Sequence, residues 1–347
     1  MKIALTSVQV PFIQGGAEVL ALNLKHQLEK KKHEVDIVTI PFKWYPPSAL
    51  IDTMISSRLV DLSEINGEKI DLVIALKFPM YYCQHDNKVL WMMHQHRQAY
   101  ELWGTEFGDL HMFEEGEEVR NSIINSDNRF LGEYKKRYTI SKTVSNRLEQ
   151  YNNLPSTPLY HPPQNYELLY CNGFDDYIFY PGRITHIKRQ HLLIEAMAYT
   201  KNPVKLILAG SGDENYIKQL KLIIHEHNLG DRVKFVGMVS EKEKIDLYAN
   251  ALAVFNGPYE EDYGYVTLEG FFAKKPVITL SDSGGPLEFV KDGINGYVVD
   301  PEAKQLADRL DYLYENKGKA KIFGADGRTL LEELNINWDY VVERLTE

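Results

Sequence analysis

Short apolar runs alternate with longer amphipathic stretches along the whole chain. In the first half, the runs typical of buried strands span residues 2–6, 34–40, 72–76, 89–93 and 137–140. Helical patterns follow the first of these runs, after Gly16, and the last, where Ser141 is expected to cap a helix over residues 142–151. Strands that alternate with helices in this way predict a parallel sheet covered by helices.

A proline-rich segment, residues 154–163, interrupts this pattern. Four prolines in ten residues cannot continue a helix or a central strand, so a domain boundary is expected there. The alternation then restarts, with strands expected at residues 177–180, 205–209, 233–236, 251–255, 276–280 and 296–299. Helices are expected at residues 189–197, 214–227, 241–250, from 265 onward, at 287–290, and over 318–344 with a break at Asn337. The fold class predicted is α/β, with two Rossmann-like, doubly wound parallel sheets.

The length of the chain supports this two-domain interpretation. Single hydrophobic cores rarely grow beyond about 250–300 residues, and this chain has 347. Hydrophobic residues make up 44% of it and charged residues 25%, which predicts a folded soluble protein. The formal net charge of −10 argues against a nucleic-acid partner, because that kind of binding depends on Lys and Arg side chains that neutralise phosphates.

Cysteine usage and the first residues predict a location in the cytoplasm. Cys83 and Cys171 lack the spacing of metal ligands, and two thiols without a disulfide framework fit a reducing compartment. The chain runs directly into a strand without the features of a signal peptide. No run approaches the ~20 apolar residues that a membrane-spanning helix needs.

An acidic loop after the strand expected at 251–255 carries the most specific chemistry. Glu261 lies in this loop, and Glu269 follows eight residues later, about one turn into the next helix. If Gly264 forms the tight turn between them, both carboxylates can face one pocket, with the amides of residues 265–267 in between. Carboxylates suit sugar hydroxyls and amides suit phosphate oxygens, so the loop predicts a nucleotide-sugar site. The alternative is an ordinary acidic loop and a helix start favoured by the macrodipole alone.

Two further strand-to-helix loops contain candidate binding residues. Arg183 and Lys188 follow the strand expected at 177–180, where two fixed cations could clamp a diphosphate; the alternative is a pair of solvated loop cations. Gly15 and Gly16 stand at the first such turn of the chain. The G-x-G-x-x-G pattern is absent, so a dinucleotide site is not predicted, and a turn that needs positive φ explains Gly15 at least as well.

A histidine pair follows the strand expected at 89–93. His94 is placed at its carboxyl end for a pocket role, and His96 and Arg97 next to it invite a metal or phosphate hypothesis. A zinc site would need a further protein ligand with suitable spacing, and none is convincing, so no metal is predicted. The aromatic and acidic segment 99–124 is expected to be helical or partly mobile, and its role cannot be read from the sequence.

Taken in chain order, these residues resemble a GT-B glycosyltransferase of glycosyltransferase family 4. The resemblance is strongest over residues 177–301, where the following match the family pattern: Gly182 with Arg183, Lys188, Gly264, the Glu261 and Glu269 pair, Ser283-Gly284-Gly285, and Asp292 to Gly296. The first half matches more loosely, through Gly15, Gly16 and His94. Residues 256–259, Asn-Gly-Pro-Tyr, replace the more usual proline-serine approach to the first glutamate, and Glu260 and Asp262 add two neighbouring acids.

The resemblance implies a retaining transfer of a hexose-type sugar from a nucleoside-diphosphate sugar, without a bound metal or cofactor. It implies a Rossmann-like domain over residues 1–165, to which the helix 335–347 returns, and a donor-binding domain over residues 166–334, facing each other across a cleft. The acceptor would be a saccharide or a lipid-linked saccharide in glycan or polysaccharide biosynthesis. Peripheral contact with the inner membrane surface stays open.

The resemblance also implies a role for each candidate residue. Arg183 and Lys188 would hold the diphosphate, Glu261 the donor sugar and Glu269 the ribose, while His94 would lie near the reacting sugar. The remaining donor-binding positions are glycines and backbone amides, namely Gly15, Gly16, Gly237, Met238, Gly264, Tyr265, Val266 and Thr267. Of these, Gly237 and Met238 would meet the base, and the Val266 and Thr267 amides would face phosphate.

Other activities share this fold. A sugar-nucleotide epimerase and a non-catalytic nucleotide-sugar-binding module are both compatible with the same residues. A phosphorylase would need a lysine for pyridoxal phosphate, and no motif for one is evident. The sequence names neither the sugar, nor the base, nor the acceptor.

Overall fold

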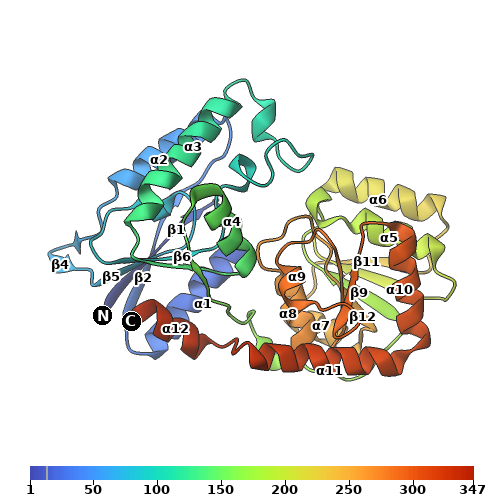
Figure 1. The fold of residues 1–347 in the computed structure, drawn as a ribbon. Coiled ribbons are helices and arrows are strands. Elements are labelled where there is room, and N and C mark those ends of the chain that lie inside the picture. The colour runs from blue at the N-terminus through green and yellow to red at the C-terminus, as the bar shows by residue number, and fades with distance from the viewer. Residues whose placement is uncertain (13–14) are drawn as a thin grey trace. The chain divides into compact units, whose positions relative to one another are not determined.

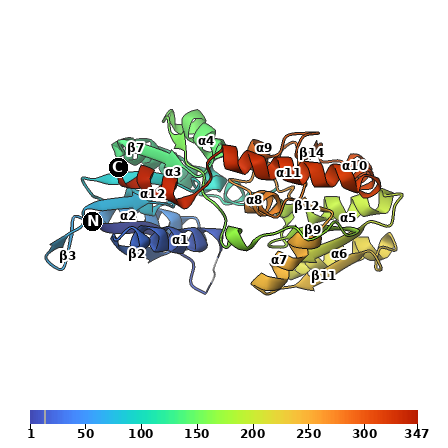
Figure 2. The same cartoon turned by 90° about the horizontal axis from the view of Figure 1, so that it is seen from below.

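The computed structural model describes residues 1–12 and 15–347, and it divides into two compact domains. The first domain comprises Met1–Gln164 and Asn337–Glu347, and the second comprises Asn165–Ile336. Both ends of the chain therefore lie in the first domain (Figure 2). The sequence led us to expect the first domain at residues 1–165 and 335–347 and the second domain at residues 166–334.

The first domain is built on a parallel six-stranded sheet in the order β2-β1-β5-β6-β7-β8. Two of its central strands are fully buried and, apart from Lys88, apolar, as expected of parallel strands with helices on both faces. Pro158 lies in the edge strand β8, where no ladder hydrogen bond from its nitrogen is required. The strands are β1 (Lys2–Gln9), β2 (Glu34–Pro41), β5 (Leu72–Ala75), β6 (Lys88–Met92), β7 (Lys136–Thr139) and β8 (Thr157–Pro158).

Helices cover both faces of this sheet. The helices α2 (Ser48–Leu59) and α3 (Gly116–Phe130) pack together on one face, and α1 (Gly16–Lys30) packs with the C-terminal α12 (Trp338–Thr346) on the other (Figure 1). The helix α4 (Lys142–Asn152) follows β7 and contacts α3. As predicted, the Ser141 hydroxyl caps α4, accepting a hydrogen bond from the Val144 amide at 3.0 Å. A hairpin, β3 (Glu64–Ile65) and β4 (Glu68–Lys69), extends from the domain.

The second domain repeats this architecture with a parallel sheet in the order β11-β10-β9-β12-β13-β14. Strand order reverses at β9 and β12, which are adjacent although three helices separate them in the chain. Ligands of open α/β sheets bind beside the carboxyl ends of strands at such a reversal. The strands are β9 (Tyr177–Pro181), β10 (Lys205–Ala209), β11 (Val233–Gly237), β12 (Ala253–Phe255), β13 (Val277–Leu280) and β14 (Gly296–Val299).

Helices also enclose the second sheet. The helix α5 (Gln190–Tyr199) packs against α6 (Glu214–Glu226) and α10 (Ala303–Glu315), whereas α8 (Tyr265–Phe272) packs against α11 (Lys317–Glu333). Figure 1 shows α5, α6 and α10 on one face of the sheet and α7 (Glu241–Asn250), α8 and α11 on the other. The short α9 (Pro286–Phe289) follows β13. The fold class predicted from the sequence is confirmed: both sheets are parallel and doubly wound.

Most expected elements are found within one or two residues of their predicted bounds, and β10, α7 and β14 match without change. Two helices, α2 and α10, were not predicted. In α2, Ile55 and Leu59 are exposed while Ser57 is buried, which obscures the helical pattern. Segment 99–124 contains short 3-10 turns, and α3 begins only at Gly116 and continues to Phe130. A search of the described residues finds no helix long and apolar enough to cross a membrane.

Candidate functional site

Three loops at the carboxyl edge of the second sheet are joined by backbone hydrogen bonds. The amide of Tyr259, after β12, donates to the carbonyl of Ile187, after β9, at 2.8 Å. The amide of Glu261 donates to the carbonyl of Ser283, after β13, at 2.9 Å, and the Gly285 amide returns to the Glu261 carbonyl at 2.7 Å. The acidic loop is therefore held between its neighbours on both sides.

Lys188 and Glu261, two of the predicted site residues, meet directly. The Lys188 Nζ donates to Glu261 Oε2 at 2.6 Å, and both side chains are about a quarter exposed. The hydroxyl of Tyr180 donates to the Lys188 carbonyl from the end of β9. The backbone beneath the cation is thus fixed, while both charged ends still reach solvent.

Arg183 lies in the same loop as Lys188 but is exposed. Its carbonyl accepts a hydrogen bond from Gln190 Nε2 at 3.0 Å, which anchors the backbone. Within residues 1–12 and 15–347, its guanidinium has no protein hydrogen bond or ion pair. The side chain therefore remains available to a ligand.

Gly264 forms the tight turn predicted between the two glutamates. It caps α8 in the left-handed region, with φ 87°, and a Cβ atom there would lie 2.8 Å from Pro286 Cγ. The Thr267 amide donates to the Gly264 carbonyl at 2.9 Å, so it is already engaged, contrary to the expectation of a bare amide. The amides of Tyr265 and Val266 precede the Thr267 amide in the first turn of α8.

Asn256, at the point where the chain departs from the family pattern, fixes the start of α8. It is buried, and its Nδ2 donates to the Thr267 hydroxyl at 2.9 Å. Its carbonyl accepts from the Thr279 hydroxyl at 2.7 Å. One residue, through its side chain and its backbone carbonyl, thus joins β12, β13 and the first turn of α8.

Glu269 is held by two residues of α7. Its Oε2 accepts from the Tyr248 hydroxyl at 2.6 Å, and its Oε1 lies 3.1 Å from Lys244 Nζ. Burial lowers the pKa of Lys244, but the carboxylates of Glu269 and Glu241 outweigh this effect and leave it raised. Each carboxylate oxygen has a second lone pair, so this arrangement orients Glu269 while leaving acceptor capacity for a diol.

The charges of Glu269 and Glu261 both affect the pKa of the Tyr265 phenol. Burial raises its pKa, and the charges of Glu269 and then Glu261 raise it further. The ring of Tyr265 packs edge-on against Tyr263, with centroids 5.3 Å apart. The sequence pointed to the backbone amide of Tyr265 and not to its ring.

The predicted base-binding position lies at the end of β11. Gly237 adopts φ 70°, and its carbonyl accepts from the Gly210 amide at 2.8 Å. Met238 is 76% exposed. Its apolar side chain is therefore open to solvent at the end of this strand.

Sequence reasoning missed Arg189, which is the most highly connected cation of the site. The sequence assigned it to the helix, but it adopts φ 54° and α5 begins at Gln190. Its guanidinium donates to the carbonyls of Gly257 and Pro258 and forms a bidentate pair with Asp282, at 2.6 and 2.7 Å. It is buried and ties the three loops together. The only feature of the sequence that could have indicated this role is that a second basic residue directly follows Lys188.

The remaining predicted site residues, Gly15, Gly16 and His94, belong to the first domain. Gly15 caps α1 with an extended backbone, φ −137° and ψ −169°, so the alternative that it serves a positive-φ turn is wrong. Its amide donates to the Glu18 carboxylate at 2.8 Å. The residues just before it, 13 and 14, lie outside the described part of the chain.

His94 follows β6 and is partly buried. Its Nδ1 lies 2.6 Å from the carbonyl oxygen of Gln95, so a proton on this nitrogen is shared with the backbone. His96 packs on Phe78, with ring centroids 5.1 Å apart, and burial followed by the nearby His94 lowers the pKa of His96 to about 3. In the described ranges, no three His, Cys, Asp or Glu side chains gather as a metal site.

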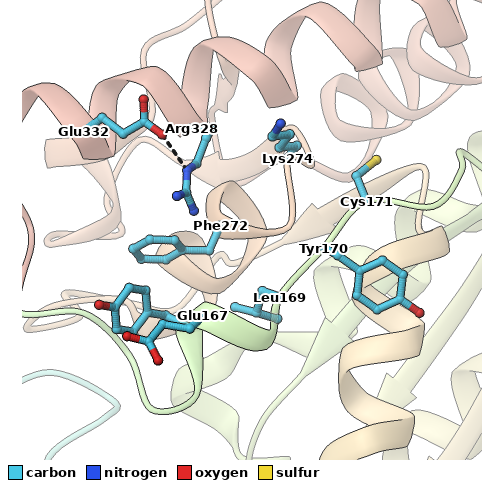
Figure 3. A pocket seen from close by; sticks show the side chains of 9 residues that line it. Glu167, Leu169, Tyr170, Cys171, Phe272, Lys274, Arg328 and Glu332 are labelled. Carbon is cyan, nitrogen blue, oxygen red and sulfur yellow. Dashed lines mark hydrogen bonds and ion pairs between the residues drawn. The ribbon is translucent and has the colours of Figure 1, made fainter.

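A separate cavity of about 640 Å³ lies at the other end of α8 and contains none of the predicted site residues. Tyr166 and Phe272 both line it, and their rings are tilted by 53° with centroids 4.9 Å apart. The Arg328 guanidinium lies over the ring of Phe272 (Figure 3). Arg328 also pairs with Glu332 on α11 at 2.9 Å. Glu167 and Lys274 also line the cavity.

Comparison with known proteins finds similar sequences, most of them aligned to part of the chain. Residues 172–330 match the family model described as glycosyl transferases group 1. The chain is 34% identical over 134 residues to the alpha-1,3/1,6-mannosyltransferase ALG2 of Dictyostelium discoideum, a match covering 37% of this chain and 32% of that protein. It is 25% identical over 393 aligned positions to the spore coat protein SA of Bacillus subtilis, covering 99% of this chain and 98% of that protein. The match thus spans about a third of ALG2.

Solved structures share the fold across both domains. Sucrose-phosphate synthase of Thermosynechococcus elongatus has a TM-score of 0.78 at 19% identity, covering 99% of this chain and 97% of that one. Anabaena HepE, solved in complex with UDP-glucose, has a TM-score of 0.70 at 18% identity, covering 100% and 98%. These likenesses show the GT-B fold. The family match adds to this only for residues 172–330, which lie within the second domain.

Proposed function

We propose that this protein is a retaining, metal-independent glycosyltransferase that moves a hexose-type sugar from a nucleoside-diphosphate sugar to a saccharide or lipid-linked acceptor. The observation that carries the proposal is the group Lys188, Glu261, Gly264 and Glu269. A cation paired with a carboxylate, a helix start and a second carboxylate are the groups that would suit the diphosphate, the sugar and the ribose of a nucleotide-sugar.

The chemistry proposed is stabilisation of charge on the leaving group. As the bond between the sugar C1 and the diphosphate oxygen breaks, negative charge grows on the diphosphate and positive charge on the sugar ring. Lys188 and Arg183 would neutralise the diphosphate, and Glu261 would orient the sugar. Donors fixed before the reaction supply several kcal/mol of such stabilisation. The oxygen of the acceptor hydroxyl would bond to C1 on the face of the sugar that the diphosphate leaves, and its proton would pass to the departing diphosphate oxygen.

The proposal assigns the remaining residues to recognition. Glu269 would accept hydrogen bonds from the ribose hydroxyls, and Gly237 with Met238 would meet the base. Tyr265 and Val266 would offer amides to phosphate, Thr267 sharing its amide with Gly264. The first-domain residues Gly15, Gly16 and His94 would contact the donor. In the same proposal, residues 1–165 and 335–347 form the acceptor side, and residues 166–334 form the donor side.

A donor panel tests this function. Thermal unfolding is followed with UDP-, GDP-, ADP- and dTDP-sugars, because a ligand at a hundred times its Kd stabilises by about 2.7 kcal/mol. Each stabilising donor is then incubated alone and with saccharide acceptors. Transfer, or slow hydrolysis to free sugar and nucleoside diphosphate, supports the proposal. Interconversion of sugar-nucleotides indicates an epimerase, and binding without turnover a non-catalytic module.

The absence of a metal requirement is tested in the same assay. Full turnover in EDTA is expected, since Lys188 and Arg183 supply the charge that a divalent cation would otherwise supply. Loss of turnover in EDTA that magnesium restores would contradict this part of the proposal. The anomeric configuration of the product, read by NMR, decides between retention and inversion.

A further inference from the structure

A buried carboxylate in the first domain has three phenols as donors. Asp127, on α3, is fully buried. It accepts hydrogen bonds from the hydroxyls of Tyr81 at 3.0 Å, Tyr82 at 2.6 Å and Tyr100 at 2.7 Å. Within the described chain, no Lys, Arg or His forms an ion pair with it. A carboxylate buried without a cation is costly, so such a network is seldom retained for stability alone.

One residue connects this network to His94. The Gln95 Nε2 donates to Asn152 Oδ1 at 2.5 Å and lies 3.5 Å from Asp127 Oδ2, and the side chain is buried. The Gln95 carbonyl is the oxygen that lies 2.6 Å from His94 Nδ1. Asn152, at the end of α4, also donates to the Tyr100 hydroxyl at 3.4 Å. Gln95 thus links the imidazole of His94 to the buried carboxylate of Asp127.

The fixed backbone carbonyl also selects the tautomer of His94. A proton on Nδ1 is held by the Gln95 oxygen, which directs Nε2 away from the backbone. If Gln95 loses its side-chain anchors, its peptide group can rotate, and both the position and the tautomer of His94 then change. The network therefore acts on the histidine through the backbone, without touching a substrate.

We infer that Asp127 and Gln95 are positioning residues, which hold the loop 94–97 so that His94 is oriented for sugar transfer. The inference rests on the proposed function for its catalytic part only. The orienting part concerns the protein alone and can be measured without a substrate.

The ionisation of Asp127 gives the network a pH dependence. Burial raises the pKa of Asp127 to about 6, although the hydrogen bonds from Tyr82, Tyr100, Tyr81 and Gln95 oppose this effect. On protonation one carboxylate oxygen becomes a donor, and it can no longer accept from every phenol that faces it. Arg97, in the loop after His94, and Arg147, on α4, both pair with Oε1 of Glu101, at 2.6 and 3.2 Å, and not with Asp127.

The inference is tested with two variants and one matched control. Asp127→Asn keeps the size of the side chain but fixes it in a neutral form, and Gln95→Ala removes the link while leaving the carboxylate in place. Tyr134→Phe is the control, because its buried hydroxyl donates to the Tyr81 carbonyl at 2.5 Å and contacts neither Asp127 nor Gln95. Turnover, KM, the affinity for nucleoside diphosphate and the melting temperature are measured for each.

We expect both variants to lower kcat by about ten- to a hundredfold, the effect of a small misplacement of a catalytic group. Affinity for nucleoside diphosphate should change less than twofold, and Tyr134→Phe should retain kcat. Asp127→Asn should also lack the wild-type fall in kcat below pH 6 and show the low acid-side value throughout. Wild-type kcat in Asp127→Asn and Gln95→Ala, or an equal loss in Tyr134→Phe at the same change in melting temperature, would overturn the inference.

An activity-free measurement separates this inference from the proposed function. Hydrogen exchange at the amides of residues 94–97 and the 15N shifts of the His94 ring are compared across the variants. Faster exchange and a changed tautomer in Gln95→Ala and Asp127→Asn, but not in Tyr134→Phe, support the positioning role even if no nucleotide-sugar is turned over. Unchanged exchange and shifts contradict it, whatever the activity.

Discussion

The ammonium of Lys188 lies 2.6 Å from Oε2 of Glu261, and the two side chains come from loops after β9 and β12, which are adjacent in the second sheet. The pair lies where the strand order reverses, so the position is set by topology. Each group restrains the other before any ligand arrives. A diphosphate bound as proposed would therefore meet a cation whose direction is already fixed.

Lys188→Ala should lower turnover by roughly 10²–10³-fold, as loss of one fixed donor to a developing charge does elsewhere. The melting temperature should change little, because a partly exposed ion pair contributes about 0–1 kcal/mol. Glu261→Gln should reduce turnover as well, through a less well-oriented sugar and lysine. Steady-state kinetics with the best donor and thermal unfolding are the measurements. The control is Lys218→Ala, because Lys218 is an exposed lysine of α6. If Lys188→Ala turns over as fast as this control, Lys188 has no part in the mechanism.

Arg183 and Arg189 should separate function from stability. Arg183→Ala is expected to lose turnover with a change in unfolding free energy of less than about 0.5 kcal/mol, since its exposed guanidinium makes no protein hydrogen bond among the described residues. Arg183→Lys should also be impaired, because an ammonium cannot reproduce a bidentate fork. Arg189→Ala should instead destabilise by roughly 2–4 kcal/mol, leaving two carbonyls and Asp282 without their donor.

Denaturant unfolding and turnover of the two alanine variants make this comparison. The opposite result, an unstable Arg183→Ala and a stable Arg189→Ala, would mean that the assignment of the two arginines is reversed. Near-normal turnover in both Arg183→Ala and Lys188→Ala would remove the diphosphate assignment.

Glu269→Ala should weaken binding of nucleoside diphosphate by about 1.5–3 kcal/mol, the worth of hydrogen bonds to a charged group. Tyr248→Phe should weaken it less, because it removes only the hydroxyl that orients Glu269, at 2.6 Å. Isothermal titration with the nucleoside diphosphate, and with the nucleotide whose ribose lacks the 2′-hydroxyl, makes the comparison. If Glu269 contacts the ribose, the deoxy ligand loses affinity with the wild type and not with Glu269→Ala. Equal losses in both proteins would place the ribose elsewhere.

The sequence was sufficient for the sheets because their central strands are continuous apolar runs with no competing interpretation. It also led to Glu261, Gly264 and Glu269, because a strand, a glycine turn and a helix leave few conformations for a loop of that length. It could not reveal Arg189, whose role depends on carbonyls and a carboxylate far along the chain, nor Asp127, whose three phenols are brought together only by tertiary packing. The amide of Thr267 shows the same limit, since only the actual turn determines that it bonds to Gly264.

Gly264→Ala should destabilise the protein by roughly 1–3 kcal/mol, because φ 87° is strained for alanine and its Cβ would lie 2.8 Å from Pro286. Affinity for nucleoside diphosphate should fall further, since any relief of the strain moves the start of α8. Gly230→Ala is the control, because a Cβ there meets nothing within 4 Å. Thermal unfolding and titration are measured for both. A Gly264→Ala protein as stable as Gly230→Ala would contradict the strain described for this turn.

Asp127 should make the protein more stable at mildly acid pH than at neutral pH, opposite to the effect of a salt-bridged aspartate. Burial raises its pKa from the ordinary value of 3.8 to about 6 in the folded state. The folded protein therefore binds this proton more tightly than the unfolded chain, and the free energy of unfolding from this group rises as pH falls from about 7 towards 4. The full difference, about two pH units, corresponds to on the order of 3 kcal/mol.

Asp127→Asn has no such group, so its contribution should be flat over this range, and it should be at least as stable as the wild type at pH 7.5. The test is the difference in unfolding free energy between wild type and Asp127→Asn, measured by urea at half-unit steps from pH 4.5 to 7.5, in which other titrating groups largely cancel. A difference that does not vary with pH would mean that Asp127 titrates near its ordinary value and that the three phenols offset its burial.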